Sequence, residues 1–119
     1  MSIAEINEQL IRAVGVGIAI VGEETLDFRF GNEKFIEWFG EIGADVTLPA
    51  IFPDIDINGM RADLEAGASH AVEIKVKPKS KRRTLVIALS VSRALSNGQS
   101  LIIVECQNIT RIRELESMI

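Results

Sequence analysis

The sequence from Val16 to Phe30 decides the fold, and it reads Val16-Gly-Ile-Ala-Ile-Val21, Gly22-Glu-Glu-Thr25, Leu26-Asp-Phe-Arg-Phe30. The first part is a short β-branched run and predicts a strand that is apolar on both faces. Glycine and polar residues then predict a turn. Apolar and polar residues alternate from 26 to 30, which predicts a second, half-buried strand. Two strands across a short turn form a hairpin.

A short helix is predicted directly after this hairpin. Asn32 is a favoured N-cap residue because its side chain accepts a hydrogen bond from a backbone N–H that has no partner within the helix. Gly40 suits the C-terminal end. Within residues 33–39 we expect Phe35, Ile36 and Phe39 to share one face.

Residues 41–69 are less periodic and predict short helices and loops. Pro49 and Pro53 leave room for one or two helical turns between them, and Asn58-Gly59 is typical of a turn. A further helix is predicted after that turn and ends at Gly67. Its apolar face contains Met60, Leu64 and Ala68.

The last third of the chain predicts a three-stranded meander. Alternating apolar residues indicate strands over 72–76 and 85–91. Asn97-Gly98 is a strong hairpin signal, although the loop from Ala94 could be longer than two residues. Residues 101–104 are apolar without alternation, so this strand should be covered on both faces, like the strand at 16–21. The order of elements predicts an α+β domain on one five-stranded antiparallel sheet, with the helices of 32–68 on one side.

Amphipathic helices are predicted at both ends of the chain, and they divide it into a helix over 1–14, a core over 15–108 and a helix over 109–119. The first helix is expected to cover the other side of the sheet. The last helix meets no glycine or proline stop, so we expect the natural protein to continue beyond residue 119. Both helices carry apolar seams that favour a homodimer, formed by Ile3, Ile6, Leu10, Ile112, Leu115 and Ile119.

Composition limits the functional classes. The chain has 119 residues and a net charge of −4, which predicts one domain and no nucleic-acid partner. Its single cysteine, Cys106, excludes an internal disulfide and suits a reducing compartment. No apolar run is long enough to span a bilayer, and Glu5 and Glu8 do not suit a signal peptide. We expect a cytoplasmic protein.

The basic residues are unevenly placed. Six of the thirteen lie between Lys75 and Arg83 without an intervening acid, so the remainder of the chain carries a net charge of 7 − 17 = −10. This cluster is either a solvated hairpin tip or a docking patch for an acidic partner or an anionic lipid.

Order and spacing resemble the PAS family over essentially the whole chain. The opening hairpin with Asn32 resembles the family's first strands and characteristic asparagine, and Phe39-Gly40 resembles its phenylalanine–glycine pair. Asn108-Ile109-Thr110 resembles the family's aspartate-isoleucine-threonine, with asparagine in place of aspartate. The resemblance implies a non-enzymatic sensor or dimerisation module. Its C-terminal helix would relay a signal, through Asn108, Ile109 and Thr110, to a downstream histidine kinase, nucleotide cyclase or diguanylate cyclase.

The resemblance also implies a cavity between the sheet and the helices that could hold a small molecule. The residues that would line it are Phe28, Phe30, Asn32, Phe35, Phe39, Phe52, Met60 and Leu64. The same apolar residues could simply fill the core, and Asn32 could simply cap its helix. The cofactor stays unknown. Haem is not supported, because His70 lies away from the helix that carries the axial ligand in haem-binding relatives. Cys106 lies on the last strand instead of near Asn32, which does not support covalent flavin photochemistry.

Two alternatives remain. The first is a ligand-free dimerising spacer of the same fold. The second is a small cone-shaped enzyme of the ketosteroid-isomerase kind, which needs a buried carboxylate and an oxyanion donor that is commonly tyrosine. The chain has no tyrosine, and its aspartates fall in polar or loop contexts. Asp54 and Asp56 lack further ligands nearby, so no metal site is predicted.

Overall fold

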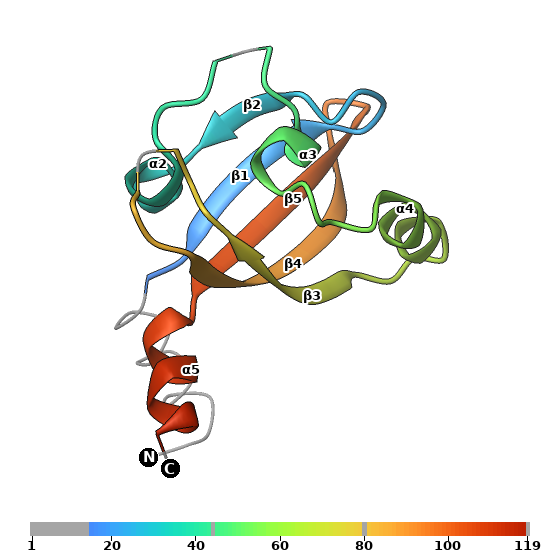
Figure 1. The fold of residues 1–119 in the computed structure, drawn as a ribbon. Coiled ribbons are helices and arrows are strands. Elements are labelled where there is room, and N and C mark those ends of the chain that lie inside the picture. Colours follow the sequence, from blue (N-terminus) through green and yellow to red (C-terminus); the bar gives the residue numbers. More distant parts are fainter. Residues whose placement is uncertain (1–14, 44, 80, 119) are drawn as a thin grey trace, which may run out of the picture.

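The computed structural model describes residues 15–43, 45–79 and 81–118. Five strands there form one antiparallel sheet in the order β2-β1-β5-β4-β3 (Figure 1). This confirms the predicted sheet, and the two strands without alternation, β1 and β5, are neighbours in its interior. The strands are β1 (Gly17–Gly22), β2 (Phe28–Gly31), β3 (His70–Val76), β4 (Leu85–Ser96) and β5 (Gln99–Asn108).

The helices between β2 and β3 pack on one face of this sheet, as predicted (Figure 1). They are α2 (Glu33–Phe39), α3 (Leu48–Ile51) and α4 (Ile57–Glu65). The helix α5 (Thr110–Ser117) follows β5 and projects beyond the sheet. The predicted helix over 1–14, with Ile3, Ile6 and Leu10, lies outside the described residues, as does Ile119. No helix among the described residues has the length and apolar character needed to cross a membrane.

Asn32 is the N-cap of α2, because its Oδ1 accepts a hydrogen bond from the Phe35 N–H at 3.0 Å. Gly40 ends this helix with φ +80°, a conformation that glycine adopts without strain. The buried face of α2 differs from the prediction. Trp38 is buried together with Phe35 and Phe39, whereas Ile36 is 38% exposed.

The predicted turn at Asn58-Gly59 is wrong, because both residues lie in the first turn of α4. Asp56 caps this helix through its Oδ1, which accepts a hydrogen bond from the Gly59 N–H at 3.0 Å. A capping residue two positions upstream therefore overrides the local turn propensity. Met60 and Leu64 are buried on one face as expected, but Ala68 lies beyond the helix and is exposed.

The alternation predicted from Leu26 to Phe30 is interrupted. Val21 pairs with Phe28 and Ile20 pairs with Phe30, so Arg29 is an extra residue in β2 and forms a bulge. Phe28 faces the core with Val21, but Phe30 is placed opposite Ile20 on the other face of the sheet. Its side chain is 52% exposed.

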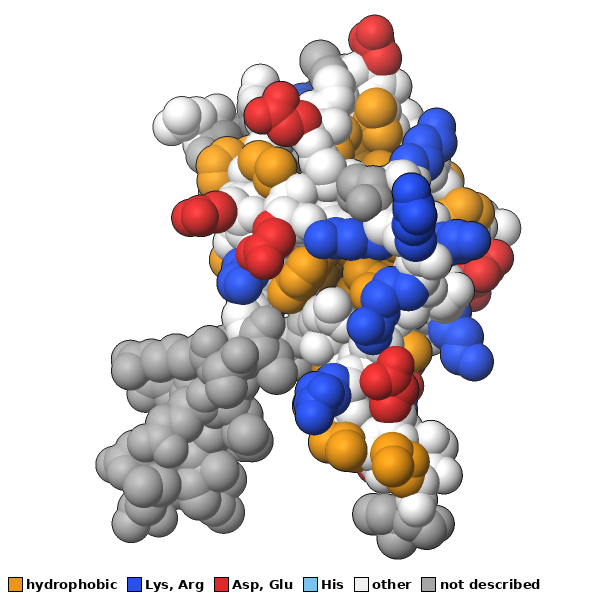
Figure 2. Space-filling view, turned by 60° about the vertical axis from the view of Figure 1, so that its left-hand side comes forward, with side chains coloured by type: hydrophobic (Ala, Val, Ile, Leu, Met, Phe, Trp, Pro, Cys, Tyr) orange, Lys and Arg blue, Asp and Glu red, His pale blue; other side chains and the backbone are white. Residues whose placement is uncertain are grey.

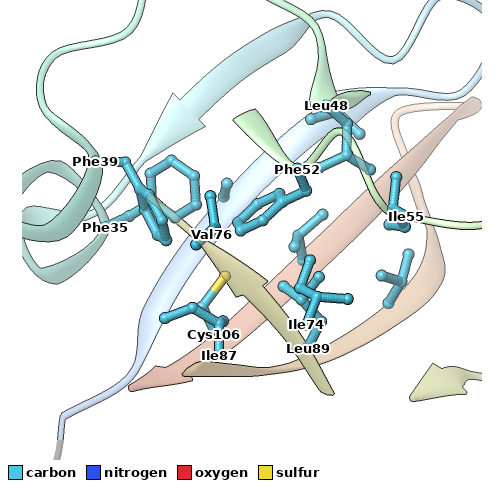
Figure 3. Close-up of a cluster of buried hydrophobic side chains, with 14 of the residues drawn as sticks. Phe35, Phe39, Leu48, Phe52, Ile55, Ile74, Val76, Ile87, Leu89 and Cys106 are labelled. Atoms are coloured by element: carbon cyan, nitrogen blue, oxygen red, sulfur yellow. The ribbon is translucent and has the colours of Figure 1, made fainter. Parts of the chain in front are cut away.

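The core lies between the sheet and helices α2 to α4 (Figure 3). Four phenylalanine rings form a continuous row through it. The centroid distances are 5.5 Å for Phe28–Phe35, 4.8 Å for Phe35–Phe39 and 5.1 Å for Phe39–Phe52. Such tilted and edge-on contacts stabilise aromatic pairs beyond simple burial.

The β4–β5 hairpin turns in two residues, since Ser96 pairs with Gln99. Asn97 and Gly98 have φ values of +51° and +77°, as a tight hairpin of this kind requires. The longer loop considered from Ala94 is therefore not formed.

Candidate functional site

The junction between β5 and α5 is held by a small hydrogen-bonded cluster. Thr110 is 5% exposed, and its Oγ accepts a hydrogen bond from the Val86 N–H of β4 at 2.9 Å. The Ile109 N–H donates to the Val86 carbonyl at 2.9 Å. Both backbone groups of Val86 therefore form hydrogen bonds with the start of α5.

Asn108 supplies the acceptor that an aspartate would supply at the same place. Its Oδ1 accepts hydrogen bonds from the Thr110 N–H at 3.1 Å and from the Thr110 hydroxyl. The amide oxygen thus fixes the orientation of the Thr110 hydroxyl without carrying a charge. The three residues predicted for signal relay, Asn108, Ile109 and Thr110, are brought together at this junction.

Two ion pairs connect α5 to the rest of the domain. The Arg113 guanidinium donates to Glu73 of β3, and Arg83 lies 3.3 Å from the Glu114 carboxylate. The hydrogen bond from Arg113 lowers the pKa of Glu73. Contacts with Glu73 and then Glu116 raise the pKa of Arg113. All of these groups are exposed, so each pair stabilises the domain weakly and mainly orients the helix.

The described part of α5 presents an apolar stripe to solvent. Ile112 and Leu115 are 42% and 50% exposed, and Met118, the C-cap residue that follows the helix in helical conformation, is also exposed. Residues three apart lie on the same side of a helix. Two of the six residues predicted for a dimer seam are therefore placed on one exposed face, next to a methionine that was not predicted there.

The residues predicted to line a ligand cavity divide into two groups. Phe35, Phe52 and Met60 have no exposed surface, and Phe28, Phe39 and Leu64 are also buried. These six belong to the core between sheet and helices. Figure 3 labels Phe35, Phe39 and Phe52 among them. Phe30 does not join them, because the bulge at Arg29 places it on the other face of the sheet. It lines a pocket of about 270 Å³ beside β2, together with Phe28 and Phe35.

Asn32 joins the start of β1 to the start of α2. In addition to the bond from Phe35, its Oδ1 accepts from the Ile18 N–H at 2.9 Å, and its Nδ2 donates to the Val16 carbonyl at 3.0 Å. Two donors occupy the amide oxygen, so one amide N–H is all that remains for another partner. The geometry supports the structural role considered for this residue.

The remaining polar candidates have structural surroundings. The His70 Nδ1 lies 2.8 Å from the Asp63 Oδ2, so this pair joins β3 to α4. Cys106 faces the core, where burial and, to a lesser extent, Glu105 raise the pKa of its thiol. Within the described residues, no three His, Cys, Asp or Glu side chains are grouped as a metal site requires, and Thr110 is the only buried polar residue.

Sequence reasoning did not find Val86, Glu73 or Arg113, and it found Arg83 only as a member of the basic cluster. Glu73 and Arg113 are 40 residues apart in the sequence, and Arg83 and Glu114 are 31 apart. Such pairs carry no local pattern. Only the strand pairing and the direction of α5 bring them together.

No family model and no curated protein matches the chain. Solved structures do. An RNA-binding light-oxygen-voltage receptor matches with 14% identity and a TM-score of 0.63, over 99% of this chain and 39% of that chain. A PAS domain from a two-component sensor histidine kinase matches with 13% identity and a TM-score of 0.61, over 88% of this chain and 95% of that chain.

A third similar structure is the N-terminal domain of a diguanylate cyclase with PAS/PAC sensor from Marinobacter aquaeolei. It has 11% identity and a TM-score of 0.59, over 83% of this chain and 99% of that chain. Together with the strand order and the one-sided helices, these likenesses confirm the fold expected from the sequence.

Proposed function

We propose that this chain, which has the PAS fold, is a cytoplasmic sensory and dimerisation domain that relays a signal through α5 to a downstream effector. The similar solved domains come from proteins described as a sensor histidine kinase and a diguanylate cyclase, and we propose an effector of one of these kinds. The observation that carries the proposal is the junction at Thr110, where one strand residue, Val86, forms two hydrogen bonds with the start of α5.

The relay works by biasing two arrangements of α5. In the present arrangement the helix is held by Val86 at its start, and along its length by the Glu73–Arg113 and Arg83–Glu114 contacts. The ion pairs are exposed and weak, so a modest displacement of β3 or β4 is enough to exchange them for others. A ligand shifts such an equilibrium only by its difference in affinity for the two states.

Dimerisation through α5 supplies the second half of the proposal. Its exposed stripe of Ile112, Leu115 and Met118 is stabilised when a second copy covers it. The test is sedimentation equilibrium of the whole chain and of the double variant Ile112→Asp/Leu115→Asp. We expect the whole chain to be a dimer. The dimer dissociation constant of the double variant should be at least about tenfold higher, because two charges would enter the apolar seam.

The matched control is Ser117→Asp, which adds a charge to α5 at an exposed position away from the stripe. It should leave the dimer intact. A wild-type chain that is monomeric at high micromolar concentration, or a control as disruptive as the double variant, would contradict dimerisation through this helix.

A ligand-free spacer is the second candidate, and the filled core favours it. Phe35, Leu48, Phe52 and Met60 have no exposed surface, which leaves the interior occupied by the protein's own side chains. Native mass spectrometry of the purified chain separates the two functions. A retained small molecule supports sensing, whereas the bare mass in every preparation, with the dimer intact, supports the spacer.

A further inference from the structure

A groove of about 660 Å³ lies outside the core, between the end of β3 and the segment that runs from α2 to α3. Figure 2 shows lysine and arginine side chains gathered on this side of the molecule, beside exposed apolar surface. One wall is the end of β3 and the stretch that follows it, with Lys75, Val76, Lys77, Pro78 and Lys79. The opposite wall consists of Phe39, Gly40, Glu41, Ile42, Val46, Ala50, Ile51, Pro53 and Asp54.

The groove has the composition of a small-molecule site. Ile42, Val46 and Ile51 are only partly buried against the core, and together with Pro53 and Pro78 they give it an apolar lining. Its volume falls within the range of about 300 to 1,000 Å³ that is typical of pockets for small ligands. A molecule seated here would cover apolar surface that the domain itself leaves accessible to water.

The basic side chains that line the groove all lie on one of its walls. Lys75, Lys77 and Lys79 stand along the β3 wall, and among the described residues no carboxylate forms an ion pair with any of them. We infer that this groove binds a small amphiphilic anion, a molecule with an apolar body that lies on the groove lining and a single carboxylate-type head that faces the lysines.

The opposite wall restricts the head group. Glu41 and Asp54 line it, and both are exposed. Their carboxylates would repel the additional charges of a polyanion such as a nucleic acid, or of an anionic membrane laid across the groove. A single negative charge beside the lysines, with an uncharged body toward the other wall, avoids this repulsion.

The groove is also mechanically connected to α5. Lys75 and Glu73 are on the same strand, and Glu73 accepts the hydrogen bond from Arg113 of α5. Arg83, on the same β3–β4 connection as Lys77 and Lys79, pairs with Glu114. A ligand that draws the lysines toward its head would pull on both contacts. The inference therefore deepens the sensor role proposed above, rests on it, and names the class of ligand.

Octanoate is a suitable probe, with 1-octanol and octylammonium as controls that share its apolar chain. Affinities come from calorimetry on the whole chain, and the location comes from amide shifts in ¹H–¹⁵N spectra. We expect octanoate to bind about fivefold or more tightly than octanol, and octylammonium more weakly than either. The amides that shift should be those near Val76 and Ile51.

Two double variants separate the groove from general electrostatics. Lys77→Gln/Lys79→Gln removes two charges from the rim and should weaken octanoate binding about fivefold. Lys81→Gln/Arg82→Gln removes two charges from the same hairpin at positions that do not line the groove. It should change the affinity for octanoate less than about twofold. Ala50→Trp fills the groove from an exposed position and should weaken octanoate and octanol alike.

Equal affinity for octanol and octanoate, equal effects of the two double variants, or amide shifts confined to the far side of the sheet would each overturn the inference. Circular dichroism of every variant confirms that it is folded. Because binding is measured on the chain alone, its failure leaves dimerisation through α5 standing, and a monomeric chain that binds octanoate leaves the groove standing.

Discussion

The Thr110→Val substitution tests the junction most directly. Valine has nearly the same shape as threonine, so packing is kept while the hydroxyl is lost. The Val86 N–H then loses its acceptor, at a cost of about 1 to 3 kcal/mol for an unsatisfied group. At about 2 kcal/mol, the melting temperature should fall by roughly 5 to 10 °C for a domain of this size.

Hydrogen exchange at the Val86 amide provides the local measurement. If opening of this bond becomes about 2 kcal/mol easier, protection of that amide should fall about 30-fold. Urea unfolding followed by fluorescence of Trp38, the single tryptophan, gives the global value in the same samples. The loss of protection from hydrogen exchange should be concentrated at Val86 and at the first turn of α5.

Thr110→Ser is the matched control, because it keeps the hydroxyl and removes one methyl group at a cost of about 0.8 kcal/mol. Its Val86 amide should stay protected. The reasoning is refuted if Thr110→Val leaves that protection unchanged, or if the serine variant loses as much of it as the valine variant.

Three further predictions concern other sites. Asn32→Ala should lower the free energy of unfolding by about 2 kcal/mol or more, since the Ile18 and Phe35 N–H groups and the Val16 carbonyl all lose a partner. Urea unfolding measures this free energy, and a loss below about 0.5 kcal/mol would contradict the prediction. Cys106 should be inert to a thiol reagent such as Ellman's reagent in the folded chain and should react on unfolding, because burial raises the pKa of its thiol. Fast reaction of the folded protein would contradict this and show that the core admits solvent. The pKa of Glu73 should lie below its usual 4.5, because Arg113 donates a hydrogen bond to its carboxylate. The stabilisation from this contact is therefore present above pH 4.5 and lost as the pH falls through the lowered pKa. An NMR titration measures the pKa, and Arg113→Gln should return it to its usual range.

Local signals predicted the fold well where neighbouring residues decide the structure. Asn32 caps α2 because a helix start needs only a side chain within three residues. Asn97-Gly98 forms the two-residue turn because both positions require positive φ. The uninterrupted apolar runs predicted that β1 and β5 are apolar on both faces, which suits their neighbouring positions inside the sheet.

Other features depend on contacts that the sequence does not display. The bulge at Arg29 moves Phe30 from the core face to the opposite face, and one extra residue in a strand has no signature in composition. Trp38 rather than Ile36 completes the buried face of α2 because the sheet lies on that side of the helix. Likewise, the lysines were visible as a cluster, but the apolar wall facing them comes from residues about 25 to 40 positions earlier in the chain.

The pairing of β1 with β5 has a consequence for how the domain fits into a longer polypeptide. Gly17, at the beginning of β1, is opposite Cys106 near the end of β5, and adjacent strands are about 4.8 Å apart. Polypeptide entering at Gly15 and leaving through α5 therefore passes the same rim of the sheet. Segments joined to these two ends would therefore start about one strand spacing apart, at the same rim of the sheet.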